Sequence, residues 1–137
     1  MTTDSAIKTV GLTKMYADTL AVNALDLDVA RGSIYGFLGL NGAGKTTTIK
    51  MLLNLVFPTS GQGQVLGLDI VKETLKVREK VGYVSEEPVI YEQMKVSEVV
   101  NFCRETYTNW DMKVVGKYLD LFELQVGIRY TGGGENG

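Results

Sequence analysis

A glycine-rich segment places the strongest constraint on how this chain can fold. Residues 39–46, called the glycine loop below, read Gly-Leu-Asn-Gly-Ala-Gly-Lys-Thr and match the pattern G-x-x-x-x-G-K-[ST]. An apolar run over residues 33–40 leads into it, which predicts a strand buried on both faces. Apolar residues at helical spacing follow it, at Ile49, Leu52, Leu53 and Val56. We therefore predict a strand, a loop and then a helix that ends at Pro58 and the cluster 59–61.

The residue types of the glycine loop suit a triphosphate. Backbone N–H groups can surround phosphate oxygens where no Cβ blocks the approach, and Gly39, Gly42 and Gly44 give that freedom. The following helix points its N-terminal N–H groups and positive dipole end at the same anion. We expect Lys45 to reach the β- and γ-phosphates and the Thr46 hydroxyl to ligate Mg²⁺. The predicted nucleotide-binding residues here are Gly39, Leu40, Asn41, Gly42, Ala43, Gly44, Lys45, Thr46 and Thr47.

The rest of the chain alternates between strand and helix patterns. The other predicted elements are strands over 6–16, 20–29 and 64–66, a short exposed helix over 71–80, a strand over 81–84, and helices over 96–107 and 115–122. In the second strand, Leu25, Leu27 and Val29 share one face, which leaves the intervening aspartates facing water.

Composition excludes several classes of function. The net charge of −2 gives no basic surplus, so no nucleic-acid partner is expected. The single cysteine, Cys103, excludes an internal disulfide and suits a reducing compartment. The absence of histidine excludes any mechanism in which this chain supplies a histidine base or ligand. The first residues lack a signal-peptide pattern and the apolar runs are too short to span a bilayer, so we expect any membrane role to come through a partner.

Residues 34–48 resemble the Walker A region of ATP-binding cassette (ABC) proteins. They are most similar to the ATP-binding subunits of transporters, particularly of the drug- or peptide-export types, although Leu40 stands where the family usually has proline. The likeness continues at residues 12–16, where Tyr16 takes the place of the aromatic side chain that stacks on adenine. Read without the family, Tyr16 is an ordinary half-buried strand residue. The resemblance also includes Ala21-Val22 and implies that Val22 contacts the nucleotide.

Residues 81–88 are similar to the Q-loop of the family. There a glutamine touches Mg²⁺ and the attacking water and links the site to the membrane partner; this chain has Glu86 at that place. The resemblance implies a catalytic and metal-binding role for Glu86, since a carboxylate can also ligate magnesium. The alternative is a solvated acidic loop. Residues 96–107 resemble the start of the helical subdomain, which contacts the transmembrane partner.

The resemblance implies an α/β fold of the P-loop NTPase type. It comprises a mainly parallel core sheet, an N-terminal antiparallel β portion and the start of a helical subdomain. We expect a partial nucleotide-binding domain over residues 1–125, with the helical subdomain starting at about 88–125, and a Gly-rich tail over 126–137. The Leu-Ser-Gly-Gly signature, the Walker B aspartate with its catalytic glutamate, and the switch histidine are not found, so the domain is expected to be incomplete.

The function implied is that of an ATP-binding subunit of an ABC membrane transporter, with ATP and Mg²⁺ as cofactors. Its implied partners are a transmembrane permease and a second nucleotide-binding subunit across ATP, which places it in the cytoplasm at the inner face of the membrane. Two alternatives stay open: a nucleotide-binding fragment without catalysis, and a soluble ABC-type ATPase not tied to transport. A GTPase would need an Asn-Lys-x-Asp base reader, which neither residues 54–57 nor 101–104 provide.

Overall fold

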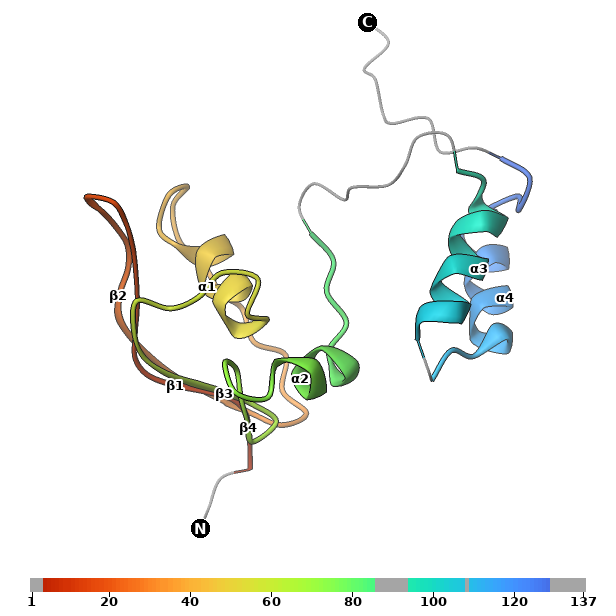
Figure 1. The fold of residues 1–137 in the computed structure, drawn as a ribbon. Helices are drawn as coiled ribbons and strands as arrows, with labels where there is room; N and C mark the ends of the chain where they lie inside the picture. Colours follow the sequence, from red (N-terminus) through yellow and green to blue (C-terminus); the bar gives the residue numbers. More distant parts are fainter. Residues whose placement is uncertain (1–3, 86–93, 108, 129–137) are drawn as a thin grey trace, which may run out of the picture. The chain divides into compact units, whose positions relative to one another are not determined.

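The computed structural model describes residues 4–85, 94–107 and 109–128 (Figure 1). The chain divides into two compact units, Met1–Gly82 and Tyr83–Gly137. Within the described residues, the first unit holds a small sheet with helices α1 and α2, and the second holds helices α3 and α4 (Figure 1). The glycine loop belongs to the first unit.

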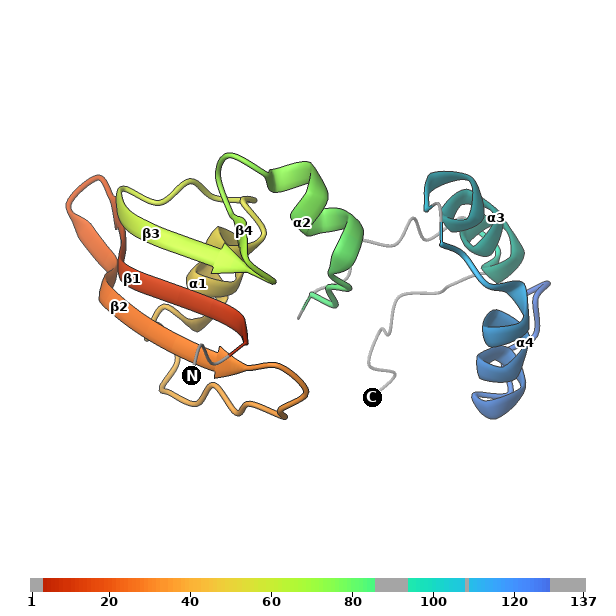
Figure 2. The ribbon, with the colours of Figure 1, turned by 90° about the horizontal axis from the view of Figure 1, so that it is seen from below.

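The sheet of the first unit is antiparallel throughout. Its strands are β1 (Ser5–Tyr16), β2 (Thr19–Ala30), β3 (Ser60–Val65) and β4 (Leu68–Asp69), in the order β2-β1-β3-β4 (Figure 2). β1 therefore has a neighbour on each side, β2 next to it in sequence and β3 far along the chain. The strands predicted over 6–16 and 20–29 are confirmed, as are the inward face with Val29 and the exposed aspartates of β2.

Two helices enclose the core against this sheet. α1 (Lys45–Leu52) and α2 (Thr74–Lys80) join the sheet in one cluster of buried side chains: Leu12, Val22, Met51, Leu52, Val65, Ile70 and Val77. Fully burying one such side chain stabilises a fold by roughly 2 kcal/mol. Because Met51 and Leu52 belong to this cluster, the core fixes the helix that opens directly after the glycine loop.

α1 ends earlier than predicted, at Leu52 instead of near Pro58. Asn54 adopts a positive φ of 50°, which helical residues do not have, and this breaks the helix. The Arg78 side chain of α2 takes over the free carbonyls: Nε donates to Leu53 O at 3.0 Å, and Nη2 donates to Asn54 O at 2.8 Å. α1 thus ends before the proline, at the positive φ of Asn54, and Arg78 of α2 bonds the carbonyls there.

Two predicted strands, 33–40 and 81–84, are wrong: both segments lie outside the sheet. Ile34 and Leu38 are 104% and 92% exposed, so the apolar run is not buried. A strand covered on both faces needs hydrogen-bonding neighbours along its edges, and neither segment has one among the described residues. The described part of the chain therefore forms the predicted N-terminal antiparallel portion but no parallel pair.

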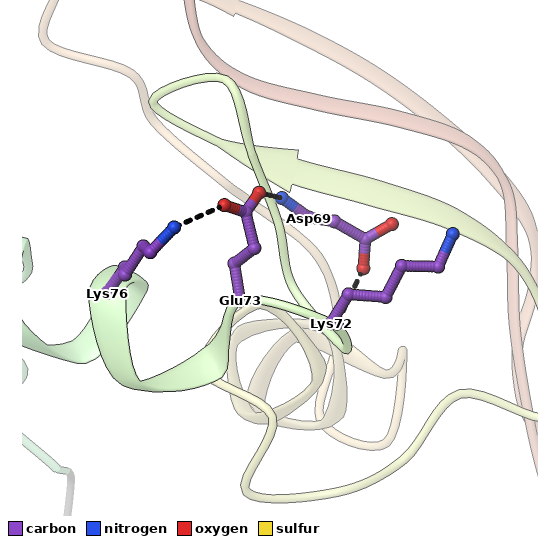
Figure 3. Close-up of polar contacts among 4 residues, drawn as sticks. All are labelled: Asp69, Lys72, Glu73 and Lys76. Carbon is purple, nitrogen blue, oxygen red and sulfur yellow. Dashed lines mark hydrogen bonds and ion pairs between the residues drawn. The ribbon is translucent and has the colours of Figure 1, made fainter.

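A polar turn leads from β4 into α2 (Figure 3). The N–H groups of Val71 and Lys72 donate to Asp69 Oδ1, both at 2.9 Å. Asp69 N–H donates to Glu73 Oε2 at 3.1 Å. Lys76 Nζ lies 3.0 Å from Glu73 Oε1. The Lys72 and Val71 donors hold the pKa of Asp69 below its ordinary value. The Lys76 ammonium, and after it the Asp69 N–H, lower the pKa of Glu73.

The second unit is a pair of helices, α3 (Val96–Thr106) and α4 (Met112–Leu121), which confirms the two helices predicted there. The rings of Tyr107 and Trp110 stack at the turn between them, with centroids 6.2 Å apart. The N–H of Ser97 donates to the carbonyl of Val126 at 3.1 Å, so the start of the predicted tail is bonded to α3. In the parts of the chain described, no helix combines the length and apolar character needed to span a bilayer.

Candidate functional site

The glycine loop is shaped by two glycines with positive φ. Gly42 has a φ of 84° and Gly44 a φ of 83°, in the left-handed region that side chains other than glycine rarely adopt. Gly44 also touches β2 directly. A Cβ atom on Gly44 would lie 2.2 Å from the Ala21 carbonyl oxygen and 2.9 Å from Val22 Cγ2. Gly44 therefore lets the end of the loop approach the sheet more closely than any other residue could.

The N terminus of α1 is left open for an anion. Gly44 is its N-cap residue, no side chain caps it, and its first turn carries no acidic residue. Thr48 closes the first turn: its N–H and its Oγ1 both donate to Gly44 O, at 2.8 and 2.9 Å. The earliest N–H groups of a helix have no partner within the helix, and with the dipole they attract negative charge. This end of α1 fits a phosphate group.

Lys45 folds back over the glycine loop. Its Nζ donates to the carbonyl of Gly39 at 2.6 Å and to that of Leu40 at 2.8 Å, while Ala43 N–H donates to Leu40 O at 3.1 Å. An ammonium has three N–H donors, so one remains for a phosphate oxygen. Leu40 and Asn41 are exposed and contribute backbone to the loop surface. The lysine charge is thus already held at the loop.

Thr46 is the predicted magnesium ligand of the glycine loop. It is exposed in the first turn of α1, whereas Thr47 is half-buried beside it. In the described ranges, no group of three or more Asp, Glu, Cys or His side chains could hold a metal ion. The Thr46 hydroxyl, with phosphate and water oxygens, could contribute to an oxygen ligand set of the kind that suits Mg²⁺. Glu86, the other predicted metal ligand, lies outside the described residues.

Tyr16 ends β1 opposite Thr19 and keeps 44% of its surface exposed. Lys14 Nζ lies over its ring, 4.9 Å from the centroid. Val22 is buried, with its side chain against Gly44. The structure thus packs Val22 against the end of the glycine loop, and its contact with the nucleotide stays a prediction.

Two residues of this region, Ala21 and Lys14, lie in segments that resemble the family, but the resemblance implied no role for either. Ala21 matters through its carbonyl oxygen, which no sequence pattern identifies. Lys14 could have been found, because residues two apart on a strand share a face and Lys14 precedes Tyr16 by two.

Comparisons with known proteins show which family the chain resembles. A family model described as "ABC transporter" matches residues 22–131. The bacitracin transport ATP-binding protein BcrA of Bacillus licheniformis is 47% identical over 92 residues, which is 67% of this chain and 30% of that protein. The probable multidrug ABC transporter ATP-binding protein YbhF of Escherichia coli (strain K12) is 38% identical over 104 residues, which is 76% of this chain and 18% of that protein.

Two solved structures have the same fold over most of the chain. A structure of an ATP binding subunit of an ABC transporter matches with a TM-score of 0.79 and 25% identity, over 91% of this chain and 54% of that one. The structure of cbiO1 from Clostridium perfringens, part of the ABC transporter complex cbiONQ, matches with a TM-score of 0.64 and 24% identity, over 86% of this chain and 49% of that one. These likenesses confirm the predicted fold class. The chain spans less than a third of these two curated relatives and about half of each solved chain.

Proposed function

The chain belongs to the ABC transporter family, and from this premise we propose that it binds Mg-ATP through the glycine loop as the ATP-binding part of a membrane transporter. The observation that carries the proposal is the geometry around Gly44. The glycine brings the loop against β2, it opens α1 without a side-chain cap, and Lys45 lies folded over the same loop. A positive helix end, an ammonium and a loop of small residues together favour a polyphosphate.

In this proposal different residues of the chain bind the phosphates, the magnesium ion and the base of the nucleotide. The backbone of Gly39, Leu40, Asn41, Gly42, Ala43, Gly44 and Thr47 surrounds the phosphates, Lys45 neutralises their β- and γ-oxygens, and Thr46 ligates magnesium. Tyr16 stacks on the base, with Val22 beside it. Glu86 is proposed as a further magnesium ligand that also orients the attacking water.

The proposal extends to partners and place. The curated relatives are named as ATP-binding proteins of bacitracin and multidrug transport, which supports a role in powering transport by ATP hydrolysis. We propose a transmembrane permease and a second nucleotide-binding subunit as partners, and a place at the inner face of the cell membrane. The competing hypotheses are a nucleotide-binding fragment without catalysis and a soluble ABC-type ATPase. Both include the same nucleotide-binding site.

Nucleotide binding is tested by calorimetric titration of the full chain with Mg-ATP. Lys45→Ala removes a charge-assisted contact worth about 2 kcal/mol, so its Kd is expected to rise at least about tenfold. Lys50→Ala, in the last turn of the same helix, is the matched control and should bind as the unchanged chain does. Equal affinity of the Lys45→Ala and unchanged chains would contradict the proposal.

Turnover is a separate measurement. Phosphate release by the chain, above the background of Lys45→Ala, would exclude the non-catalytic reading. Release that rises on adding permease-containing membranes would favour transport over the soluble ATPase.

A further inference from the structure

Lys14 is fixed between an aromatic ring and a backbone carbonyl. Its Nζ lies 4.9 Å from the ring centroid of Tyr16 and donates a hydrogen bond to Phe57 O at 2.8 Å. Lys14 and Tyr16 are two residues apart on β1, so their side chains leave the strand on the same face. An ammonium over a ring face is attracted by the negative charge of the π-system. Lys14 therefore contacts the Tyr16 ring while its own position is fixed by the hydrogen bond to Phe57 O.

The carbonyl that anchors Lys14 belongs to a segment bonded to β1 at two further points. Thr59 N–H donates to Thr13 O at 2.8 Å, and Met15 N–H donates to Thr59 Oγ1 at 3.0 Å. Together with the Lys14 bond, these hydrogen bonds join the residues around Tyr16 to the segment that follows α1. The orientation of the Tyr16 ring is thus linked to the chain that leaves the helix of the glycine loop.

Part of the Tyr16 surface is exposed to solvent. The residue is 44% exposed, and its ring contact among the described residues is with Lys14. A cation on one face draws the ring's electron density toward it and leaves the opposite face less negative. That face is then better suited to an electron-rich purine. A ring that is already ordered also loses less rotational freedom when a base stacks on it.

We propose that Lys14 is a positioning residue for the nucleotide base: it holds and polarises the Tyr16 ring so that the opposite face stacks on a purine. This inference rests on the proposed function, because it takes the base of ATP as the group that Tyr16 meets. Lys14 acts through Tyr16 and makes no contact with the phosphates.

The experiment compares Mg-ATP with Mg-tripolyphosphate, which has the phosphates but no base, in calorimetric titrations of the full chain. Lys14→Met keeps the length of the side chain and removes its charge, and it should raise the Kd for ATP about threefold. The Kd for tripolyphosphate should not change. Lys14→Arg keeps a cation over the ring and should bind ATP as the unchanged chain does. Lys8→Met, an exposed lysine of the same strand, is the matched control.

A double-mutant cycle tests whether Lys14 acts through the ring. Tyr16→Leu alone should weaken ATP binding and leave tripolyphosphate binding intact. In the Tyr16→Leu background, Lys14→Met should have no further effect on ATP. Thermal unfolding midpoints of all variants check that the fold is retained; if Lys14→Met does not fold, Lys14→Gln takes its place.

Each other outcome overturns the inference in a recognisable way. An equal loss for ATP and tripolyphosphate, or an equal loss with and without the Tyr16 ring, would show a general structural role for Lys14. Normal ATP binding by Lys14→Met, with weakened binding by Tyr16→Leu, would contradict the inference and leave the proposed function standing. If neither ligand binds the unchanged chain, the proposed function fails and the inference fails with it.

Discussion

Gly42 and Gly44 have almost the same backbone conformation in different surroundings. Their φ values are 84° and 83°. A Cβ on Gly42 would meet no atom within 4 Å, whereas a Cβ on Gly44 would lie 2.2 Å from the Ala21 carbonyl oxygen. The two positions therefore separate the cost of a positive φ from the cost of a close approach.

We expect Gly42→Ala and Gly44→Ala to differ in stability. Gly42→Ala should lower the free energy of unfolding by about 1 kcal/mol, from the left-handed conformation alone. Gly44→Ala should lower it by about 3 kcal/mol, because the loop must also move away from β2. Urea denaturation of both variants and the unchanged chain measures the difference. Equal losses would mean that the contact with Ala21 does not restrict the loop in solution.

The sequence motif predicted which residues form the glycine loop, but it explained only in part why glycine is needed at position 44. The motif identified Gly44 as small so that phosphates can approach. The structure adds a second reason, the packing of Gly44 on Ala21 and Val22. That contact joins residues far apart in the chain, and a single sequence without structure gives no sign of it. The motif's roles for Lys45 and Thr46 stay predictions.

At the scale of elements, hydrophobic periodicity predicted the helices and strands that have an apolar face of their own. It failed for segments whose structure depends on contacts with another element. β2, α3 and α4 were predicted well because one face of each is apolar at the right spacing. Residues 33–40 have the composition of a buried strand but no strand beside them in the described chain. At the early end of α1, a free carbonyl is bonded by Arg78, a residue of another helix. The local sequence pattern predicts neither the missing strand nor the early end of α1.

The turn before α2 makes stability depend on pH through Asp69. The pKa of its carboxyl is lowered in the folded chain, chiefly by the N–H donors of Lys72 and Val71. Asp69 thus contributes stability above its ordinary pKa of 3.8, and the contribution is lost as the pH falls through the lower, folded value. We expect the unchanged chain to exceed Asp69→Asn in stability at neutral pH and this gap to close in acid. Urea titrations of both chains from neutral to about pH 3 measure the gap.

Lys72→Ala is the matched control for this pH dependence. The substitution removes the ammonium but keeps the backbone N–H that donates to Asp69. The difference in stability between Lys72→Ala and a double variant, Lys72→Ala with Asp69→Asn, should close over the same pH range. Loss of the pH dependence in Lys72→Ala would show that the lysine charge, and not the backbone, lowers the pKa of Asp69.

At the scale of the whole molecule, the chain exposes apolar side chains that its core does not use. Ile34 and Leu38 are almost fully exposed in the segment before the glycine loop. Neighbouring exposed apolar side chains mark contact surfaces or sites of aggregation. We therefore expect the chain by itself to be marginally stable and to associate as its concentration rises.

Replacing these side chains should separate association from stability. We expect a double variant, Ile34→Ser with Leu38→Ser, to scatter less light than the unchanged chain at high protein concentration. Its thermal unfolding midpoint should stay unchanged, because the apolar groups that it loses contact water. Leu12→Ser, at a fully buried position, should lower the midpoint instead. A large drop in the midpoint of the double variant would show that the segment is packed in solution. Clean, cooperative unfolding of a dilute monomer would contradict the expected marginal stability.

The central place of β1 also has a consequence for the order in which the molecule assembles. β1 is made before Ser60–Val65, with which it pairs, and the glycine loop and α1 lie inside the connection between these strands. Closing so long a connection is a slow, entropically costly step. A growing chain cannot pair β1 with β3 until Val65 has left the ribosome, and β4 follows later still. We expect ATP affinity to emerge with β3 pairing during refolding, which stopped-flow nucleotide binding can follow; tight binding by a chain ending before Ser60 would contradict it.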